Sequence, residues 1–598
     1  MRRCISSRRK EETVMKKNNP SSLIRLAKMM KPYMKYLYFV FFCVLVSNLG
    51  VLIKPYLVKI IIDDFLTSGL PQKGIYSITG LGISYFLVVL LSAGFTMAQR
   101  RTLARFGQAI LHKLRTEVME HILHMPIKTL DKYGSGRLIT RATNDVETLD
   151  EFYSDILVTL FQDILLLISL VFMMVKMDWQ LALVAFIGIP IIALLTFSIR
   201  KVLKRNFERM KAIIGHINGF FAENIAGMRI VQAFNRQKNK LQEFRELNES
   251  YLKTTLIQLK LHSMLRPAME VVNSMIIALL IWFGYNRIVG NFGGSAVLEL
   301  GVLYAFTDYV KQFFEPINEL AETYTTIQSA LVSADRIFSL LDEQNQEDPF
   351  EGDWDKPITG KVEFRDVWFA YDEENWILKG VSFTVNPGEK VAFVGSTGAG
   401  KTTIINLIGR YYIPQKGTIL IDDVPLERWQ LKTLRSGISV VLQDVFLFVG
   451  SIADNISIHS DLSEEQIRQA LDVSCASEFV EECGGLKGEV TEAGMNFSTG
   501  QRQLLSFARA IARDPAILVL DEATAHIDTN TEQMIQDSIE RISKNRTSIF
   551  IAHRLSTIQS CDCIFFLEKG KIVEQGNHET LMRQNGKYAG LVRSGQKD

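Results

Sequence analysis

Long apolar runs dominate the first half of the chain, and most are interrupted by few charges. A membrane-crossing helix needs about 20 mostly apolar residues. Five runs approach that length, and only Asp163 breaks the third; they are Tyr36–Ile53, Ile75–Gln99, Ile156–Val175, Trp179–Ile199 and Val271–Asn286. A weaker sixth, Val297–Glu319, is included because the chain must return to the side where its second half lies. The pattern predicts six transmembrane helices rather than buried core helices.

Lysine and arginine gather in alternate connections between these runs. Residues 1–35 hold 11 Lys and Arg with two acids, residues 200–266 hold 14, and residues 100–141 are also basic. The other connections are short and poorer in positive charge, represented by Lys73, Lys176 and Arg287. Positively charged loops stay on the cytoplasmic side of a membrane. We therefore expect a multi-pass cell-membrane protein whose N-terminus and second half are cytoplasmic.

The N-terminal segment, residues 1–35, is not expected to be a cleaved signal. Its apolar stretch begins only at Tyr36, and no small-residue cleavage site follows. Ser21–Met34 can form an amphipathic helix on the inner membrane surface; the alternative is a solvated tail. The apolar positions of this helix are Leu23, Ile24, Ala27, Met30 and Met34.

The long basic segments are themselves helical in pattern. In the first, apolar residues recur at steps of three and four, at Ile139, Ala142, Val146, Leu149 and Phe152. With a rise of about 1.5 Å per residue, such helices can extend tens of ångströms from the membrane. Their tips are expected at Pro126–Gly136 and Glu223–Phe234.

Composition agrees with a chain made of two unlike parts. The 598 residues are 47% hydrophobic and 22% charged, with a net charge of +2 and a mean hydropathy of +0.11. These values exclude a disordered chain. Six cysteines are too few for a disulfide framework, and Cys561 and Cys563 are too close together for a zinc site.

After Asp348 the pattern changes to short strands that alternate with helical segments. This is typical of an α/β domain with a parallel sheet. The expected strands are Val362–Phe364, Val391–Val394, Ile438–Leu442, Ile517–Leu520 and Ser548–Ile551.

A phosphate-binding motif follows the second of these strands. Gly395–Thr402 reads G-x-x-x-x-G-K-T and precedes the apolar segment Thr402–Ile408, as a P-loop requires. Gly398 and Gly400 let backbone N–H groups turn toward phosphates, and Lys401 adds a positive charge. The hydroxyl of Thr402 can bind Mg²⁺.

Two carboxylates end a second apolar strand, Ile517–Leu520. Asp521 is placed to reach Mg²⁺, and Glu522 to polarise an attacking water. A lone histidine, His553, follows the strand Ser548–Ile551, where a structural role is the alternative.

Together these residues resemble ATP-binding cassette exporters of the half-transporter, type IV kind, over about Ser21–Val592. The resemblance implies six transmembrane helices in the ABC exporter type 1 fold, fused to an α/β P-loop NTPase domain that hydrolyses ATP with Mg²⁺. It implies the boundaries 1–35 for a cytoplasmic segment, 36–340 for the membrane domain, 341–358 for a linker and 359–598 for the ATPase. Asp131–Val146 and Glu223–Phe234 resemble the two coupling loops.

The resemblance also assigns roles by motif. Glu522, His553 and Lys401 are implied as catalytic, and Thr402, Gln443 and Asp521 as Mg²⁺ ligands. The signature loop, which completes the ATP site of the opposite subunit, is implied at Ser498, Thr499, Gly500 and Gln501. The implied nucleotide-binding residues are Tyr371, Gly395, Ser396, Thr397, Gly398, Ala399, Gly400, Lys401, Thr402, Thr403, Gln443, Asp521 and Asp528.

The signature loop departs from the family's usual Leu-Ser-Gly-Gly-Gln. Phe497 and Thr499 stand at its first and third positions, and His526 in the D-loop is also unusual. A β-branched Thr adds bulk and restricts the backbone where the family has glycine. We expect poor hydrolysis at the site this loop completes, and therefore a heterodimer with a second half-transporter; a homodimer is the alternative.

The cargo is encoded only weakly. Charged residues inside a membrane are costly and mark candidate pathways, here Asp163, Glu270 and Asp308. An acidic path would suit lipophilic cations, as in multidrug efflux; helix-helix hydrogen bonding is the alternative. The sequence thus predicts export of hydrophobic or amphipathic small molecules, with a lipid or lipopeptide floppase, or a regulator that merely binds ATP, as alternatives. Membrane lipids are expected partners, and nucleic acid is not.

Overall fold

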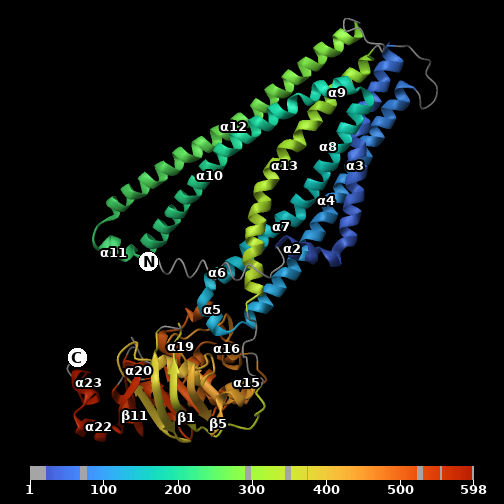
Figure 1. Cartoon of the computed structure of the whole chain (residues 1–598). Coiled ribbons are helices and arrows are strands. Elements are labelled where there is room, and N and C mark those ends of the chain that lie inside the picture. The colour runs from blue at the N-terminus through green and yellow to red at the C-terminus, as the bar shows by residue number, and fades with distance from the viewer. Residues whose placement is uncertain are drawn as a thin grey trace. The chain divides into compact units, whose positions relative to one another are not determined.

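The chain folds into two compact units (Figure 1). One unit is Met1–His121 with Ser135–Glu343, and the other is Ile122–Gly134 with Gln344–Asp598. The structure is a computed structural model. It describes residues 22–67, 77–289, 298–343, 352–372, 375–458, 460–521, 529–551 and 555–595.

The first unit is helical, and the described residues of the six predicted spans are almost all in helices. Three helices are much longer than the apolar runs inside them: α4 has 46 residues, α10 has 39 and α12 has 52. The helical pattern predicted for the basic segments is thus confirmed. The helices are α2 (Ser22–Met30), α3 (Met34–Ile60), α4 (Ile78–Leu123), α6 (Ser135–Thr140), α7 (Val146–Glu151), α8 (Leu157–Met177), α9 (Trp179–Phe186), α10 (Gly188–Ala226), α11 (Met228–Ala233), α12 (Gln237–Ile288) and α13 (Leu300–Leu341). Three short π-helical segments continue these helices. Ile61–Thr67 follows α3, Arg141–Asp145 connects α6 to α7, and Phe152–Ile156 connects α7 to α8.

One predicted span is two helices rather than one. The run Trp179–Ile199 breaks at Ile187, between α9 and α10. Pro190 has no backbone N–H, so the carbonyl four residues earlier, on Phe186, cannot receive its normal helical bond.

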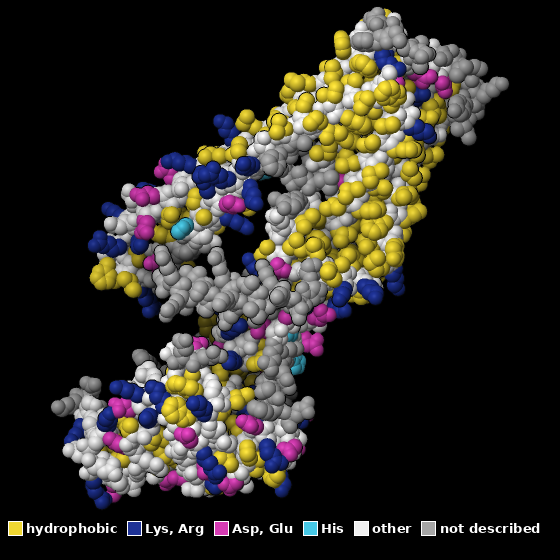
Figure 2. Space-filling model, in the orientation of Figure 1, with side chains coloured by type: hydrophobic (Ala, Val, Ile, Leu, Met, Phe, Trp, Pro, Cys, Tyr) yellow, Lys and Arg dark blue, Asp and Glu magenta, His cyan; other side chains and the backbone are white. Residues whose placement is uncertain are grey.

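Apolar side chains cover much of the surface of the helical unit (Figure 2). On α4, for example, Phe86 is 64% exposed and Leu90 is 57% exposed. By length and composition, the described helical segments that can cross a membrane are Ser22–Thr67, Ile78–Leu123, Ser135–Met177 and Gln237–Ile288. An apolar outer surface of this extent suits lipid and not water.

Polar contacts join the helices inside this unit. The hydroxyl of Tyr309 on α13 donates to the carbonyl of Leu52 on α3 at 2.8 Å. The side-chain amide of Gln99 on α4 donates to Gln162 on α8 at 3.1 Å, and Asn48 donates to the Gln162 carbonyl. Such interhelical bonds satisfy polar groups that lipid cannot.

The second unit contains an α/β core with three sheets. The six-stranded sheet has the order β12-β11-β3-β10-β9-β6, parallel except for β12. A four-stranded antiparallel sheet has the order β2-β1-β4-β5, and β7 pairs with β8. The strands are β1 (Val362–Phe369), β2 (Leu378–Val385), β3 (Lys390–Val394), β4 (Lys416–Ile421), β5 (Val424–Pro425), β6 (Ile438–Val441), β7 (Gly450–Ser451), β8 (Glu489–Val490), β9 (Ile517–Asp521), β10 (Thr547–Ile551), β11 (Cys563–Glu568) and β12 (Lys571–Gly576). All five predicted strands are present.

The helices of this unit connect the strands and pack against the sheets. Short 3-10 turns at Leu426–Arg428, Gly485–Lys487 and Glu492–Gly494 complete the connections. The helices are α5 (Ile127–Tyr133), α14 (Lys401–Ile408), α15 (Leu431–Gly437), α16 (Ile452–Ser457), α17 (Glu464–Val473), α18 (Ser477–Glu482), α19 (Thr499–Ile511), α20 (Thr529–Ile542), α21 (Leu555–Gln559), α22 (His578–Gln584) and α23 (Lys587–Gly595).

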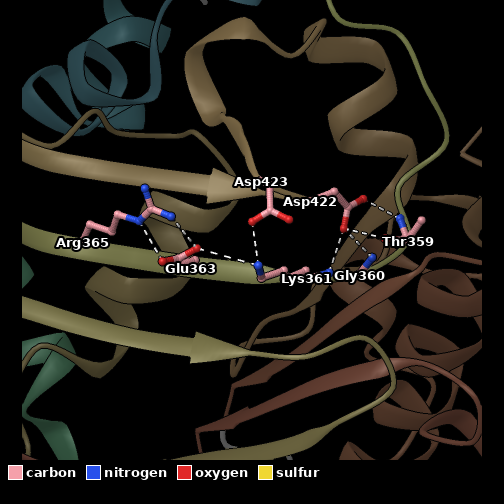
Figure 3. A network of polar contacts seen from close by, with 7 residues as sticks. All are labelled: Thr359, Gly360, Lys361, Glu363, Arg365, Asp422 and Asp423. Atoms are coloured by element: carbon pink, nitrogen blue, oxygen red, sulfur yellow. Dashed lines mark hydrogen bonds and ion pairs between the residues drawn. The ribbon is translucent and has the colours of Figure 1, made fainter.

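A turn of two aspartates fixes the segment that enters β1 (Figure 3). Asp422 and Asp423 both have positive φ, and they join β4 to β5 in a tight hairpin. The Asp422 carboxylate accepts from the backbone N–H groups of Thr359, Gly360 and Lys361, at 2.6 to 3.1 Å. Asp423 pairs with the Lys361 ammonium at 2.6 Å. The chain entering β1 is therefore held against this turn.

Candidate nucleotide-binding site

The carboxyl ends of four neighbouring strands meet at one edge of the parallel sheet. Ile551 of β10 is in register with Asp521 of β9 on one side and with Phe393 of β3 on the other. Val441 of β6 pairs with Leu520, next to Asp521. Ligands of open α/β sheets bind at this edge. The sheet thus brings the P-loop, Asp521 and the segment of Gln443 together.

The P-loop has the backbone that its glycines permit. Gly395, Gly398 and Gly400 have φ of +152°, +80° and +109°, a region that other residues rarely adopt. A side chain at Gly395 would meet the carbonyl of Leu567 at 2.2 Å. Gly400 ends the loop as the N-cap of α14, so the positive end of this helix faces the loop.

Lys401 and Thr402 begin α14 at the mouth of the loop. The buried ammonium of Lys401 donates to the carbonyls of Gly395 at 2.6 Å and Ser396 at 3.2 Å. The hydroxyl of Thr402 lies 3.5 Å from the carboxylate of Asp521. The Thr402 hydroxyl and the Asp521 carboxylate are hard oxygen ligands of the kind that Mg²⁺ prefers. The residues present therefore fit the metal that the sequence implies.

Tyr371 lies beside the P-loop helix. Its hydroxyl is 3.3 Å from that of Thr403 and accepts from the side-chain amide of Asn406 at 3.1 Å. Its ring makes an edge-to-face contact with Tyr412 at 5.0 Å, yet the residue remains 39% exposed. An aromatic ring that is anchored and still exposed can stack on a base.

The segment after Gln443 is tied to the helix of the signature loop. Arg509 of α19 donates to the carbonyls of Phe446 at 2.9 Å and Asn455 at 2.8 Å. The side chain of Asn455 exchanges hydrogen bonds with the backbone of Phe448. Burial lowers the pKa of Arg509. Sequence reasoning missed this network, because no local pattern marks contacts between residues more than 50 positions apart.

The signature loop forms the N-terminus of α19. Ser498 accepts from the backbone of Gln501 at 3.2 Å, and Gln501 accepts from the backbone of Ser498 at 2.9 Å, a capping box. Phe497 is only 5% exposed and packs on Phe479, so it anchors the loop in the core.

Thr499 occupies the first turn of α19 without backbone strain. It is not among the residues with positive φ, so this position needs no glycine for its own conformation. The backbone at Thr499 is thus one that a β-branched residue can adopt. Thr499 therefore differs from the family's usual glycine in the bulk of its side chain. It lies at a helix N-terminus, which is a position that suits an anion.

Four residues of the sequence assignment lie outside the described residues. They are Glu522, His526, Asp528 and His553. The strands that lead to them, β9 and β10, are described and end side by side.

The first predicted coupling tip packs within the second unit, which contains the α/β core. Helix α5 places Ile127 against the hydrophobic core that contains Phe369 and Tyr412. The hydroxyl of Tyr412 donates to the carboxylate of Asp131. Burial, and then the Asp131 charge, raise the pKa of Tyr412, which therefore stays a donor at neutral pH. The second predicted tip contains the short helix α11.

The candidate pathway carboxylates lie on three different helices. Asp163 of α8 is 4% exposed, and it lies within range of the charges of Glu319 and Glu315 on α13. Asp308 of α13 accepts a hydrogen bond from Gln312 at 3.0 Å, and Glu270 of α12 is exposed. The charged residues that act on Asp163 are thus Glu315 and Glu319, which are not among the predicted pathway residues.

The chain is similar to known transport proteins over most of its length. Residues 37–317 match the family described as ABC transporter transmembrane region, and residues 378–525 match the family described as ABC transporter. A probable multidrug resistance ABC transporter ATP-binding/permease protein of Bacillus subtilis, YheH, is 39% identical over 85% of this chain and 76% of its own. An ATP-dependent lipid A-core flippase of Syntrophus aciditrophicus is 33% identical over 94% and 93%. The structure of a bacterial Atm1-family ABC exporter with ATP bound has a TM-score of 0.75 and 25% identity, covering 94% of this chain and 98% of the other.

Proposed function

This chain belongs to the ABC transporter family, as an exporter with its transmembrane region fused to its ATPase, and we propose that it is one half of a pump for hydrophobic or amphipathic compounds. The observation that carries the proposal is the convergence of the P-loop, Thr402 and Asp521 at one sheet edge, in a chain with membrane-length apolar helices. The basic N-terminus and basic long segments support an orientation with the ATPase in the cytoplasm.

Each residue of the nucleotide site has a proposed task. Lys401 and the P-loop N–H groups hold the phosphates, and Tyr371 stacks on adenine. Thr402 and Asp521, with Gln443, would hold Mg²⁺, which neutralises phosphate charge when it is bound. Glu522 accepts a proton from the attacking water, and His553 contacts the terminal phosphate. Asp528 belongs to the loop that follows Glu522.

The proposed pump is a dimer, since the chain contains one P-loop and one signature loop. Each nucleotide would lie between the P-loop of one subunit and the signature loop, Ser498–Gln501, of the other. ATP would then favour the closed pair of ATPase domains, and hydrolysis would release it, so the ligand shifts an equilibrium between two states.

We favour a heterodimer over a homodimer because of Thr499. Its bulk stands in the loop that would cap the nucleotide held by the partner, whereas this chain keeps Glu522 for its own site. A partner with an ordinary signature would restore one competent site. Purification of the tagged chain from its native host tests this: a second, related subunit in stoichiometric amount is expected, and an active single-subunit species would contradict it.

The proposed cargo is a lipophilic cation, as in multidrug efflux. A buried carboxylate at Asp163, with Asp308 and Glu270 elsewhere in the helical unit, supports a path for positive charge. The printed description of the Bacillus subtilis relative is consistent with this class.

A lipid floppase is the second candidate, supported by the relative described as a lipid A-core flippase. Stimulation of ATP hydrolysis in proteoliposomes separates the two. Cationic dyes are expected to stimulate wild-type protein and to lose their effect with Asp163→Asn. Stimulation by lipids alone would favour the floppase.

A further inference from the structure

The N-terminal helix α2 is fastened to the end of α13. One guanidinium nitrogen of Arg25 contacts both carboxylate oxygens of Asp342, at 2.6 and 2.8 Å. The same guanidinium lies over the ring of Phe338, 4.2 Å from its centroid. Ser22 adds a hydrogen bond to Asp335. Since α13 ends at Leu341, these contacts lie at the last turns before the chain leaves for the ATPase domain.

A second contact holds the middle of α2 against the protein. Leu26 is 1% exposed, and its carbonyl accepts a hydrogen bond at 3.0 Å from the fully buried Tyr153. Leu26 is not among the apolar positions predicted to face the membrane, and it faces the protein instead. The helix also ends at Met30, earlier than predicted, because Pro32 follows.

Two apolar side chains of α2 are exposed. Leu23 is 50% exposed and Ile24 is 51% exposed. One turn further along, α3 begins at Met34 and carries the exposed aromatic residues of the first span. The exposed apolar residues of α2 are thus followed, on the next helix, by those of the surface expected to contact lipid.

Three exposed lysines follow on successive turns of this segment, at Lys28, Lys31 and Lys35. Among the described residues none of the three has a carboxylate partner, unlike Arg25 or Lys59. Figure 2 shows Lys and Arg side chains along one border of the apolar surface of the helical unit. Residues 1–21 add seven more Lys and Arg against two acids.

We propose that Lys28, Lys31 and Lys35 form a binding surface for the headgroups of anionic phospholipids. Unpaired ammonium groups beside exposed Leu23 and Ile24 match a headgroup phosphate above acyl chains. Near an anionic membrane each such lysine contributes attraction that falls off within a Debye length. An amphipathic helix with this arrangement lies in the membrane interface.

The lipid bound there regulates the pump through Arg25. Headgroups that hold α2 in the interface also hold Arg25 against Asp342, and so fix the end of α13 that leads to the ATPase domain. Anionic lipid is therefore expected to raise ATP hydrolysis. This inference rests on the proposed function, since it needs ATP hydrolysis and a cytoplasmic N-terminus.

The test uses the full chain, with its partner subunit if one co-purifies, in nanodiscs of phosphatidylcholine with increasing phosphatidylglycerol. Wild-type ATP hydrolysis is expected to rise with phosphatidylglycerol. Lys28→Gln/Lys31→Gln/Lys35→Gln is expected to weaken the attraction to anionic lipid by about a hundredfold, and so to lose most of the stimulation at the same phosphatidylglycerol content. The matched control is Lys432→Gln/Lys544→Gln/Lys571→Gln, which removes three exposed lysines from the ATPase unit and should respond like wild type.

Three further arms separate the explanations. Lys28→Arg/Lys31→Arg/Lys35→Arg keeps the charge and should keep the response, which also checks folding. Arg25→Gln should still bind phosphatidylglycerol, measured by native mass spectrometry, yet lose the stimulation. Inorganic phosphate should not replace the lipid.

An equal response of wild type and the Lys→Gln variant to phosphatidylglycerol would overturn the inference. Absence of ATP hydrolysis in every lipid would instead contradict the proposed function itself. The two failures are therefore distinguishable in one set of measurements.

Discussion

The hydroxyl of Tyr412 donates a hydrogen bond of 2.5 Å to the carboxylate of Asp131. The ring of the same tyrosine meets Tyr371, the residue proposed to stack on adenine, at 5.0 Å. Helix α5 is thus connected through Tyr412 to the ring proposed to hold the base. A movement of Tyr371 on nucleotide binding would act on α5 through Tyr412.

Tyr412→Phe is expected to uncouple substrate from hydrolysis. The substitution keeps the ring but removes a hydrogen bond to a charged group, which stabilises by about 1.5–3 kcal/mol. We expect the ratio of drug-stimulated to basal ATP hydrolysis in proteoliposomes to fall several-fold, with ATP affinity nearly unchanged.

Tyr411→Phe is the matched control, because the ring of Tyr411 faces the guanidinium of Arg435 at 5.3 Å. Tyr411→Phe should give the same ratio of drug-stimulated to basal ATP hydrolysis as the wild-type protein. An unchanged ratio in Tyr412→Phe would show that the hydroxyl does not transmit the signal.

Glu522→Gln is expected to stop turnover and leave ATP binding intact. A general base contributes about 10²- to 10⁴-fold to the rate, and glutamine has a similar shape without the proton acceptor. Single-turnover hydrolysis and nucleotide binding, measured on the same preparation, check both parts. Undiminished hydrolysis would refute the assigned role.

Chelation of Mg²⁺ by EDTA is expected to abolish hydrolysis. Thr402→Ala removes one of the two oxygen groups that lie 3.5 Å apart, so it should raise the Mg²⁺ concentration for half-maximal activity by about tenfold, equivalent to about 1.4 kcal/mol. Thr402→Ser keeps the hydroxyl and should stay near wild type. The same Mg²⁺ dependence in all three proteins would remove Thr402 from the metal site.

Replacement of Thr499 tests why the second ATP site is expected to be weak. Because the backbone at this position is already helical, bulk rather than conformation is the proposed cause. Both Thr499→Gly and Thr499→Ala should therefore raise hydrolysis in the assembled dimer, although glycine weakens the helix by about 1 kcal/mol relative to alanine. If neither variant exceeds wild type, the side chain does not limit the site.

The parts of the fold that depend on local pattern were predictable. The P-loop was identified because Gly395, Gly400 and Lys401 follow a buried strand within one short segment. The long helices were predicted from runs of apolar residues and from steps of three and four.

Contacts between distant segments were not predictable in the same way. Asp131 and Tyr412 are 281 positions apart, and neither residue type marks such a pair. Likewise Leu26 reads as one more apolar residue until Tyr153 is placed beside it. A break such as that at Ile187 depends on a single proline inside an uncharged run.

Uptake of a cationic dye into inside-out vesicles from the native host tests the pump most directly. With ATP, vesicles containing the wild-type chain should accumulate the dye against its gradient, and vesicles containing Glu522→Gln should not. Equal accumulation in the two, or none in wild-type vesicles whose protein hydrolyses ATP, would contradict ATP-driven export of this class of compound.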